Sequence, residues 1–201
     1  MEVGPEHERR QEHAAMREQL TTRRLELRCF RPRDAEELHA IFSDPLTRTF
    51  TGGAFTEPAQ TRRWIERRMQ AFADTGLAWY GLRLQGTGQL VGNCGLFPGP
   101  SGPTVTEIGY EIHQPHQGRG LAAEAAAAVL AEATACAVGE VWATVRPDNA
   151  ASLRLTARLG FTHRHTRQEG GRPLLYLACP AEATADSAGD ETAGRWTAAD
   201  G

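Results

Sequence analysis

The sequence contains few cysteines, and none of them lies close enough to another to form a paired motif. Its four cysteines are Cys29, Cys94, Cys136 and Cys179. Zinc sites and redox motifs usually need pairs such as C-x-x-C, and disulfide-stabilised secreted domains need more cysteines in a shorter chain. The pattern therefore predicts reduced thiols in a cytoplasmic protein, with neither a disulfide framework nor a metal site.

The sequence also lacks long apolar runs and an excess of positive charge. No segment approaches 18 apolar residues without a charge, which predicts no transmembrane helix. Residues 1–24 are charged throughout, so we expect no signal peptide. The formal net charge is −3, whereas proteins that bind nucleic acids directly carry a basic excess that neutralises phosphates. Neither a membrane nor a nucleic acid is therefore an expected partner.

Length and composition predict one folded domain with two extensions. A chain of 201 residues with 40% hydrophobic residues can bury one sizeable core. We assign this domain to residues 22–179, preceded by a charged extension at 1–21 and followed by a tail at 180–201. The tail is rich in Ala, Thr, Asp, Glu and Gly and is expected to be disordered. Residues 6–20 contain helix formers with only two apolar anchors, which favours a marginal helix.

The hydrophobic periodicity between these extensions predicts a mixed α/β (α+β) fold. Asp34 with Glu37 three residues later forms a helix-start signature, and Pro58 suits the first turn of a second helix. We expect strands at about 25–29, 78–84, 89–97, 104–113 and 140–145, further helices at about 119–136 and 149–159, and a final hairpin that turns at 169–172. The strand–helix–strand unit over 104–145 implies a right-handed crossover.

Two glycines separate an expected strand from a long alanine-rich helix. Gly118 and Gly120 flank Arg119, and the helical pattern begins directly after them. Glycines at a strand-to-helix turn leave backbone N–H groups bare, and the helix N-terminus adds the positive end of its dipole. Arg119 supplies a fixed cation beside these groups. The turn therefore predicts a site for a phosphate or pyrophosphate group.

Two familiar phosphate-binding motifs fit this turn poorly. A P-loop is excluded because the residues after Gly120 are not lysine and a hydroxyl residue. The dinucleotide-binding string is satisfied by Gly118, Gly120 and Ala123, but it also needs an acidic residue after the next strand to hold a ribose. The only candidate, Glu140, comes before the expected strand at 141–145. A nicotinamide-dependent oxidoreductase is therefore a disfavoured alternative.

Several short motifs occur in a fixed order over most of residues 22–179. They are Leu25-Glu26-Leu27-Arg28 with Arg31-Pro32, Val91-Gly92-Asn93-Cys94-Gly95-Leu96, Glu107-Ile108-Gly109-Tyr110, Gly118-Arg119-Gly120-Leu121-Ala122-Ala123-Glu124-Ala125, Asn149-Ala150-Ala151-Ser152 and Leu159-Gly160-Phe161. The ordered set resembles the GNAT family of acyl-CoA-dependent N-acyltransferases. Within it, the set is similar to the branch that acetylates the N-termini of ribosomal proteins. The family's loop has Gln or Arg three residues before the first glycine of the turn, whereas this chain has Pro115 there.

The resemblance implies a fold, a cosubstrate and an activity. The GNAT fold has a mixed, mostly antiparallel sheet of about six to seven strands with helices on both faces, and two central strands splay apart to admit pantetheine. The implied cosubstrate is acetyl-CoA, whose acetyl group passes directly to an amine. Backbone N–H groups beside Ile112 and His113 are the implied donors to the thioester carbonyl. The residues implied to bind the cosubstrate are Ile112, His113, Gln117, Gly118, Arg119, Gly120, Leu121, Ala122 and Asn149.

The amine must lose a proton, and two carboxylates lie beside the implied slot. Glu107 and Glu111 are four residues apart on one strand and therefore share a face. Glu107 matches the acidic position that some GNAT members use as a base, so we prefer it to Glu111. A role as solvated surface charges is the alternative for both. His113, His116 or a chain of water molecules could also accept the proton.

The departing thiolate needs a proton, and the resemblance points to Ser152. Many relatives have a tyrosine at the position of Thr156, whereas the N-terminal-acetyltransferase branch has a serine that matches Ser152. A serine in the first turn of a helix is also a common N-cap, which is the structural alternative for Ser152. Asn149 could cap the same helix and contact the pantetheine amides.

The acceptor amine is left open between a protein N-terminus and a small molecule. The polar segment at 47–55, with Trp79 and Tyr80, is the expected wall of the acceptor site. Arginines at positions 62, 63, 67 and 68 predict a basic, solvated helix face. The functional alternative is that this face attracts an acidic peptide or an RNA-bound substrate. A homodimer is possible by analogy with relatives. A non-catalytic acyl-CoA-binding module is the alternative function, and it would need neither Glu107 nor Ser152.

Overall fold

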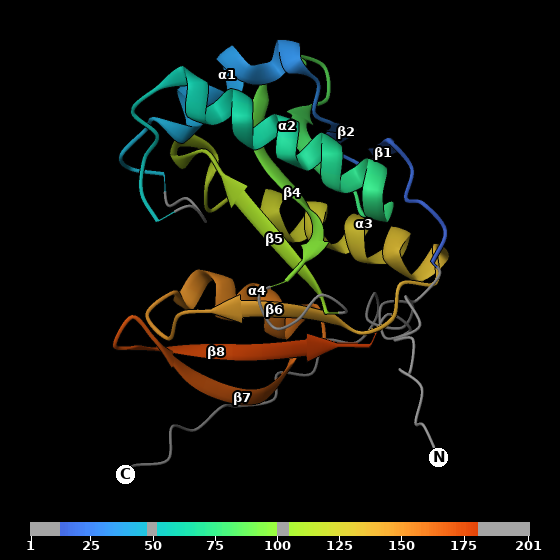
Figure 1. Cartoon of the computed structure of the whole chain (residues 1–201), viewed down its shortest axis with the longest axis vertical. Coiled ribbons are helices and arrows are strands. Elements are labelled where there is room, and N and C mark those ends of the chain that lie inside the picture. The colour runs from blue at the N-terminus through green and yellow to red at the C-terminus, as the bar shows by residue number, and fades with distance from the viewer. Residues whose placement is uncertain (1–12, 48–51, 100–104, 181–201) are drawn as a thin grey trace, which may run out of the picture.

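A computed structural model of the chain describes residues 13–47, 52–99 and 105–180. An eight-stranded sheet runs through the molecule with the strand order β1-β2-β3-β4-β5-β6-β8-β7 (Figure 1). The strands are β1 (Gln19–Thr21), β2 (Leu25–Cys29), β3 (Trp79–Leu84), β4 (Leu90–Pro98), β5 (Thr106–Ile112), β6 (Val141–Val145), β7 (Thr162–Glu169) and β8 (Arg172–Cys179). The tail from residue 181 on lies outside the described residues, so its disorder stays a prediction.

Helices cover both faces of the sheet. They are α1 (Ala35–Phe42), α2 (Pro58–Thr75), α3 (Leu121–Ala135) and α4 (Ala150–Arg158), with short 3-10 helices η1 (Pro32–Asp34) and η2 (Gln114–His116). Residues of α1 and α2 pack in one buried cluster with Trp79, and residues of α3 and α4 pack in the other with Ile108 and Ile112. Pro58 occupies the first turn of α2, where a missing N–H costs no hydrogen bond.

The predicted mixed, mostly antiparallel sheet is confirmed. Among the strands of the described residues, only β5 and β6 pair in parallel, and α3 forms the crossover between them as predicted. The sheet has eight strands rather than six to seven because the N-terminal extension contributes β1.

The marginal helix expected at 6–20 is wrong for the part that the structure describes, residues 13–20. Met16 and Leu20 are indeed buried anchors, but the chain is extended and β1 pairs antiparallel with β2. The N–H of Ala14 donates to the carbonyl of Cys136, and the N–H of Met16 donates to that of Gly76. These tertiary hydrogen bonds outweigh the local helix propensity.

The two buried clusters differ in chemistry. The larger one, under α3 and α4, is mostly aliphatic. The smaller one, under α1 and α2, contains an aromatic group in which Trp64 makes edge-to-face contacts with Phe30, Phe42 and Trp79 at centroid distances of 5.5, 5.0 and 5.7 Å. Within the described segments, none of the helices has the length and apolar character to cross a membrane.

Candidate active site

The candidate site lies where β5 and β6 separate. The two parallel strands pair only at Thr106–Val141 and Glu107–Trp142, although β5 continues to Ile112 and β6 to Val145. The predicted splay of the central strands is therefore present. Beyond residue 107, the edge of β5 that faces β6 has no ladder of backbone hydrogen bonds to that strand.

Successive residues of β5 point their N–H groups to opposite edges of the strand, and this alternation decides which N–H groups face the gap. The N–H of His113 donates to the carbonyl of Val91 on the β4 side at 2.9 Å. In an antiparallel ladder, alternate residues direct their N–H and C=O groups to the same partner, so Ile112 and Tyr110 point theirs away from β4. The interpretation of the His113 N–H as a donor to the substrate is therefore wrong. The Ile112 N–H faces the gap, and the Ile112 carbonyl accepts from Gln117 Nε2 at 2.8 Å.

The glycine turn leads from this gap into α3. Gly118 and Gly120 have φ of 72° and 74°, the left-handed region that glycine tolerates without a Cβ penalty. Gly120 is the N-cap residue of α3 and offers no side chain to the first turn. The backbone N–H groups of Leu121 and Ala122 thus begin the helix without a side-chain cap, which suits an anionic group.

An ion pair that was not foreseen from the sequence braces the turn. Arg24 Nε lies 2.5 Å from Glu124 Oε2, and Arg24 Nη1 donates to the carbonyl of Arg119 at 2.8 Å. Thr22 Oγ1 donates to the other oxygen of Glu124 at 2.6 Å. These contacts tie the start of β2 to the first turn of α3 and hold the Arg119 backbone.

Glu107 and Glu111 share a face of β5, as predicted, and both are buried. Their exposed fractions are 1% and 4%, so the interpretation of them as solvated surface charges is wrong. Thr144 Oγ1 donates to Glu107 Oε2 at 3.3 Å across the β5–β6 pair. Buried carboxylates beside a gap in a sheet are candidates for proton transfer.

Tyr110 and Ser152 meet on the opposite face of the sheet. Tyr110 alternates with the two glutamates along β5, and its hydroxyl lies 2.5 Å from Ser152 Oγ on α4. Asn149, not Ser152, caps α4, because Asn149 Oδ1 accepts from the Ser152 N–H at 3.2 Å. The capping interpretation of Ser152 is therefore wrong, and the predicted cap at Asn149 is confirmed. Burial raises the pKa of Tyr110 to about 12, so this pair is neutral at physiological pH.

Two histidines precede the glycine turn, His113 as the N-cap of η2 and His116 as its last residue. His113 Nε2 lies 3.3 Å from Asp44 Oδ2, and the N–H of Gln114 donates to Thr47 Oγ1 at 3.1 Å. These contacts attach the segment after α1 to the end of β5. His116 Nδ1 lies 3.2 Å from Arg119 Nη1. Burial, together with the charge of that arginine, lowers the pKa of His116.

The expected walls of the acceptor site fall on different faces. Trp79 lies on the face of Glu107, whereas Tyr80 points to the opposite face, where its hydroxyl donates to the carbonyl of Arg17 at 2.7 Å. Residues 48–51 of the expected loop lie outside the described segments. Arg154 is exposed on α4, and Thr156 is buried with its hydroxyl bonded to the backbone of its own helix.

Comparison with known proteins assigns this arrangement to a family. The profile of the acetyltransferase (GNAT) domain matches residues 24–162. The chain belongs to the GNAT family of acetyltransferases. The predicted GNAT membership and enzyme class are thereby confirmed.

Individual GNAT relatives cover most of both chains. The uncharacterized protein YkkB of Bacillus subtilis is 32% identical over 158 residues, which are 77% of this chain and 91% of that protein. The uncharacterized N-acetyltransferase p20 of Bacillus licheniformis is 29% identical over 72% of this chain and 82% of its own. The acetyltransferase from Agrobacterium tumefaciens has a TM-score of 0.68 at 27% identity, with 79% and 92% of the two chains covered.

One structure with bound coenzyme A shares the GNAT fold. RimL, a ribosomal-protein α-N-acetyltransferase solved in complex with coenzyme A, has a TM-score of 0.69 over 80% of this chain and 96% of its own. The identity is 17%, so this likeness shows the fold alone.

Proposed function

We propose that this GNAT protein transfers the acetyl group of acetyl-CoA to a primary amine by direct transfer within a ternary complex. The observation that carries the proposal is the gap between β5 and β6, with an anion-binding turn at its end, the Tyr110–Ser152 pair on one face and two buried glutamates on the other. Because the two faces meet at the gap, two substrates can approach from opposite sides and react there.

The turn and the gap suit acetyl-CoA. The pyrophosphate would lie against the backbone of Gly118, Arg119, Gly120, Leu121 and Ala122, where bare N–H groups and a helix dipole favour an anion. The pantetheine arm would enter the gap beside Gln117, Ile112, His113 and Asn149. The shared fold of RimL, solved with coenzyme A, supports this placement.

The residues around the gap can complete the transfer. Glu107 or Glu111, directly or through water, accepts the proton that the amine releases as its nitrogen bonds to the acetyl carbon. The N–H of Ile112 donates to the carbonyl oxygen, which gains negative charge. Ser152 gives its proton to the sulfur as the carbon–sulfur bond breaks, and Tyr110 passes its proton to Ser152 through their 2.5 Å contact. The Tyr110 phenolate then regains a proton from solvent, and the glutamate releases the amine proton to solvent, which restores both groups.

The cysteines support direct transfer over a covalent acyl-enzyme. Burial raises the pKa of Cys29 to about 12, with Glu18 acting in the same direction. Burial also raises the pKa values of Cys94, Cys136 and Cys179. A nucleophilic cysteine instead needs a lowered pKa in an electropositive setting.

The acceptor that we propose is a primary amine on a protein N-terminus or a small molecule. The branch resemblance supports the first of these, and the free thiols are compatible with a cytoplasmic enzyme. A homodimer is part of the proposal by analogy with relatives.

Calorimetric titration with acetyl-CoA tests the cosubstrate, with NADH as the control ligand. We expect micromolar binding of acetyl-CoA and none of NADH. Release of free thiol with a panel of amines then tests the reaction, and intersecting rather than parallel initial-rate lines would support a ternary complex. Folded protein that binds no acetyl-CoA would refute the proposed function.

A further inference from the structure

Arg68 on α2 is half-buried, although the sequence predicts a solvated helix face at this position. Its guanidinium carbon lies 4.3 Å from the centroid of the Trp79 ring, 5.0 Å from that of Trp64 and 5.5 Å from that of Phe97. The neighbouring arginines 62, 63 and 67 are exposed as predicted. Arg68 is therefore held against three aromatic rings and is less exposed than its neighbours on α2.

The charge of Arg68 has no counter-ion among the described residues. Its Nε is buried without a hydrogen-bond partner there, and none of the ion pairs found within residues 13–47, 52–99 and 105–180 includes Arg68. Burial lowers the pKa of Arg68 to about 10, with Arg67 acting in the same direction. Contacts with aromatic faces compensate a desolvated cation only in part. An anionic ligand would supply the missing partner.

A cavity of about 210 Å³ adjoins Arg68. It is lined by Arg31, Met69, Phe72 and Trp79 in addition to Arg68, and Glu18 is the acidic residue in its lining. At ~30 Å³ per water molecule this volume holds about seven waters, enough for a carboxylate with a short side chain. Two guanidinium groups around one small cavity favour an anion over a cation.

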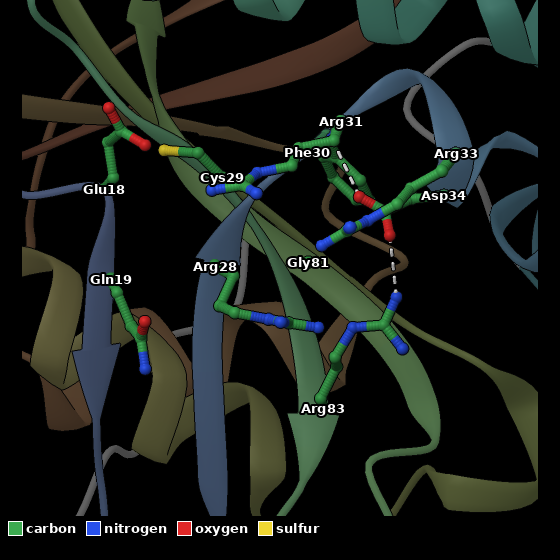
Figure 2. Close-up of a pocket in the computed structure, with 10 residues that line it drawn as sticks. All are labelled: Glu18, Gln19, Arg28, Cys29, Phe30, Arg31, Arg33, Asp34, Gly81 and Arg83. Atoms are coloured by element: carbon green, nitrogen blue, oxygen red, sulfur yellow. Dashed lines mark hydrogen bonds and ion pairs between the residues drawn. The ribbon is translucent and has the colours of Figure 1, made fainter.

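A neighbouring cavity continues along β2 and shares Arg31 with the first. Its volume is about 80 Å³, and Figure 2 shows arginine side chains gathered around Gly81 within it. Arg83 is already paired there, at 3.0 Å from Asp34 and 2.8 Å from Glu37. Arg68 differs from Arg83 because its Nε is buried without a hydrogen-bond partner among the described residues, whereas Arg83 has two carboxylate partners.

Arg68 is connected through Trp79 to the face of β5 that carries the candidate base. A Cβ at Gly109 would lie 2.6 Å from a carbon of the Trp79 ring, so the absence of a side chain lets the indole reach β5. Gly109 lies between Glu107 and Glu111 on this face. The tip of the indole therefore contacts β5 between the two carboxylates, while the Arg68 guanidinium lies over a face of the same indole.

We propose that Arg68 binds a carboxylate of the acceptor, so that the substrates are amines that also carry a carboxylate; this rests on the proposed function. The carboxylates of β5 would face the amine while Arg68 faces the acid group, which is a complementary charge arrangement for such a molecule. The carboxylate could belong to a free amino acid or to an acidic residue close to a peptide N-terminus.

Paired acceptors that differ only by amidation separate these two sources. One arm compares alanine with alaninamide, and the other compares the peptide amide Ala-Glu-Ala with Ala-Gln-Ala. The arm that shows an effect identifies the source of the carboxylate. In that arm we expect the wild-type kcat/KM to fall about 10-fold to 100-fold on amidation, the range for a hydrogen bond to a charged group. Arg68→Met should bring that ratio close to one, and Arg68→Lys should retain part of it.

A matched control and a stability measurement separate binding from support of the fold. Arg67→Met removes the same charge from the exposed neighbour and should keep the wild-type ratio. Arg68→Met should leave the Tm unchanged or raised, because it removes a buried cation without a partner. A lowered Tm with an unchanged acceptor ratio would make Arg68 a purely structural residue.

Binding of glutarate, compared with binding of glutaramide, tests without turnover whether Arg68 binds a carboxylate. By calorimetry in the presence of coenzyme A, wild type should bind glutarate and Arg68→Met should not. Equal use of both acceptors in both arms, or no glutarate binding by wild type, would overturn this inference and leave the acetyltransferase proposal standing. Glutarate binding by a protein that fails to bind acetyl-CoA would overturn the proposed function instead.

Discussion

The two faces of the central sheet differ in how they are built. On the face of α3 and α4, the candidate site consists mainly of backbone, with a glycine turn, a helix N-terminus and the Tyr110–Ser152 hydrogen bond. On the face of α1 and α2, it consists of side chains, namely the buried Glu107 and Glu111 and the half-buried Arg68, which is stacked on aromatic rings.

This difference matches the two substrates that we propose. Coenzyme A is a constant ligand, and main-chain N–H groups recognise its phosphates with little dependence on side chains. Acceptors vary between enzymes, and buried charges and ring contacts discriminate between them. If this division holds, changes on one face should alter cofactor affinity and changes on the other should alter turnover.

The largest effect is expected on the α1/α2 face. Glu107→Gln and Glu111→Gln each remove one candidate for the base that accepts the amine proton. The variant that removes the true base should lower kcat about 100-fold or more, the usual range for a general base. The Kd for acetyl-CoA should stay within about 2-fold. Steady-state thiol release with calorimetry on the same samples measures both quantities, and Glu36→Gln on the exposed side of α1 is the control. Equal losses of turnover and cofactor affinity would break the division between the faces.

The glycine turn should show the reverse pattern. Gly120→Glu forces a side chain into a left-handed conformation, at a cost of roughly 1–2 kcal/mol, and places an anion where a phosphate would bind. We expect the Kd for acetyl-CoA to rise about 100-fold. Gly86→Glu in the turn between β3 and β4 is a matched control, because its φ is 85° and the space beside it is open. Unchanged binding in Gly120→Glu would remove the turn from the cofactor site.

A smaller effect is expected at the Tyr110–Ser152 pair. Ser152→Ala should lower kcat about 10-fold, because the thiolate then leaves without its direct proton donor, and the KM for acetyl-CoA should change little. Tyr110→Phe should have a similar effect. The double variant should be no worse than either single one if the two hydroxyls act as a unit. Additive losses would show that the hydroxyls act independently.

The same contrast between the faces explains how far the sequence could be interpreted. The turn at Gly118–Gly120 and the cap at Asn149 are local patterns, and both were predicted because neighbouring residues create them. Tyr110 and Ser152 are 42 positions apart, and Arg24 and Glu124 are 100 positions apart. No local pattern reports that such residues meet, so the brace and the Tyr110 contact were missed.

Arg68 and β1 show the second way in which local patterns are insufficient. An arginine on a polar helix face is typical of a solvated position, and the packing of α2 onto Trp79 and Phe97 removes part of Arg68 from solvent. The segment before β2 has helix-forming composition, yet strand pairing and contacts with α3 hold it extended. Tertiary contacts override propensity at both places.

The smallest expected effect tests whether the α3 face depends on that N-terminal segment. Glu132 on α3 is buried, with 2% of its side chain exposed, and pairs with Arg17, whose side chain is 72% exposed. The hydrogen bond from Arg17 lowers the pKa of Glu132 below the ordinary 4.5. A carboxyl with a lowered folded-state pKa stabilises the fold above its unfolded-state pKa, and this stability is lost as the pH falls through the folded-state value.

Between pH 6 and pH 3, the Tm of wild type should therefore fall by a few degrees more than the Tm of Glu132→Gln. This follows because about 1 kcal/mol shifts the Tm of a domain of this size by ~2–4 °C. Glu140→Gln is the control, because its ion pair with Arg164 is solvent-exposed on both sides. Acetyl-CoA affinity at neutral pH should not change in Glu132→Gln, because the turn at Gly120 is braced separately by Arg24 and Glu124. A parallel loss of cofactor binding would mean that the N-terminal segment, and not the glycine turn alone, sets the geometry of the α3 face.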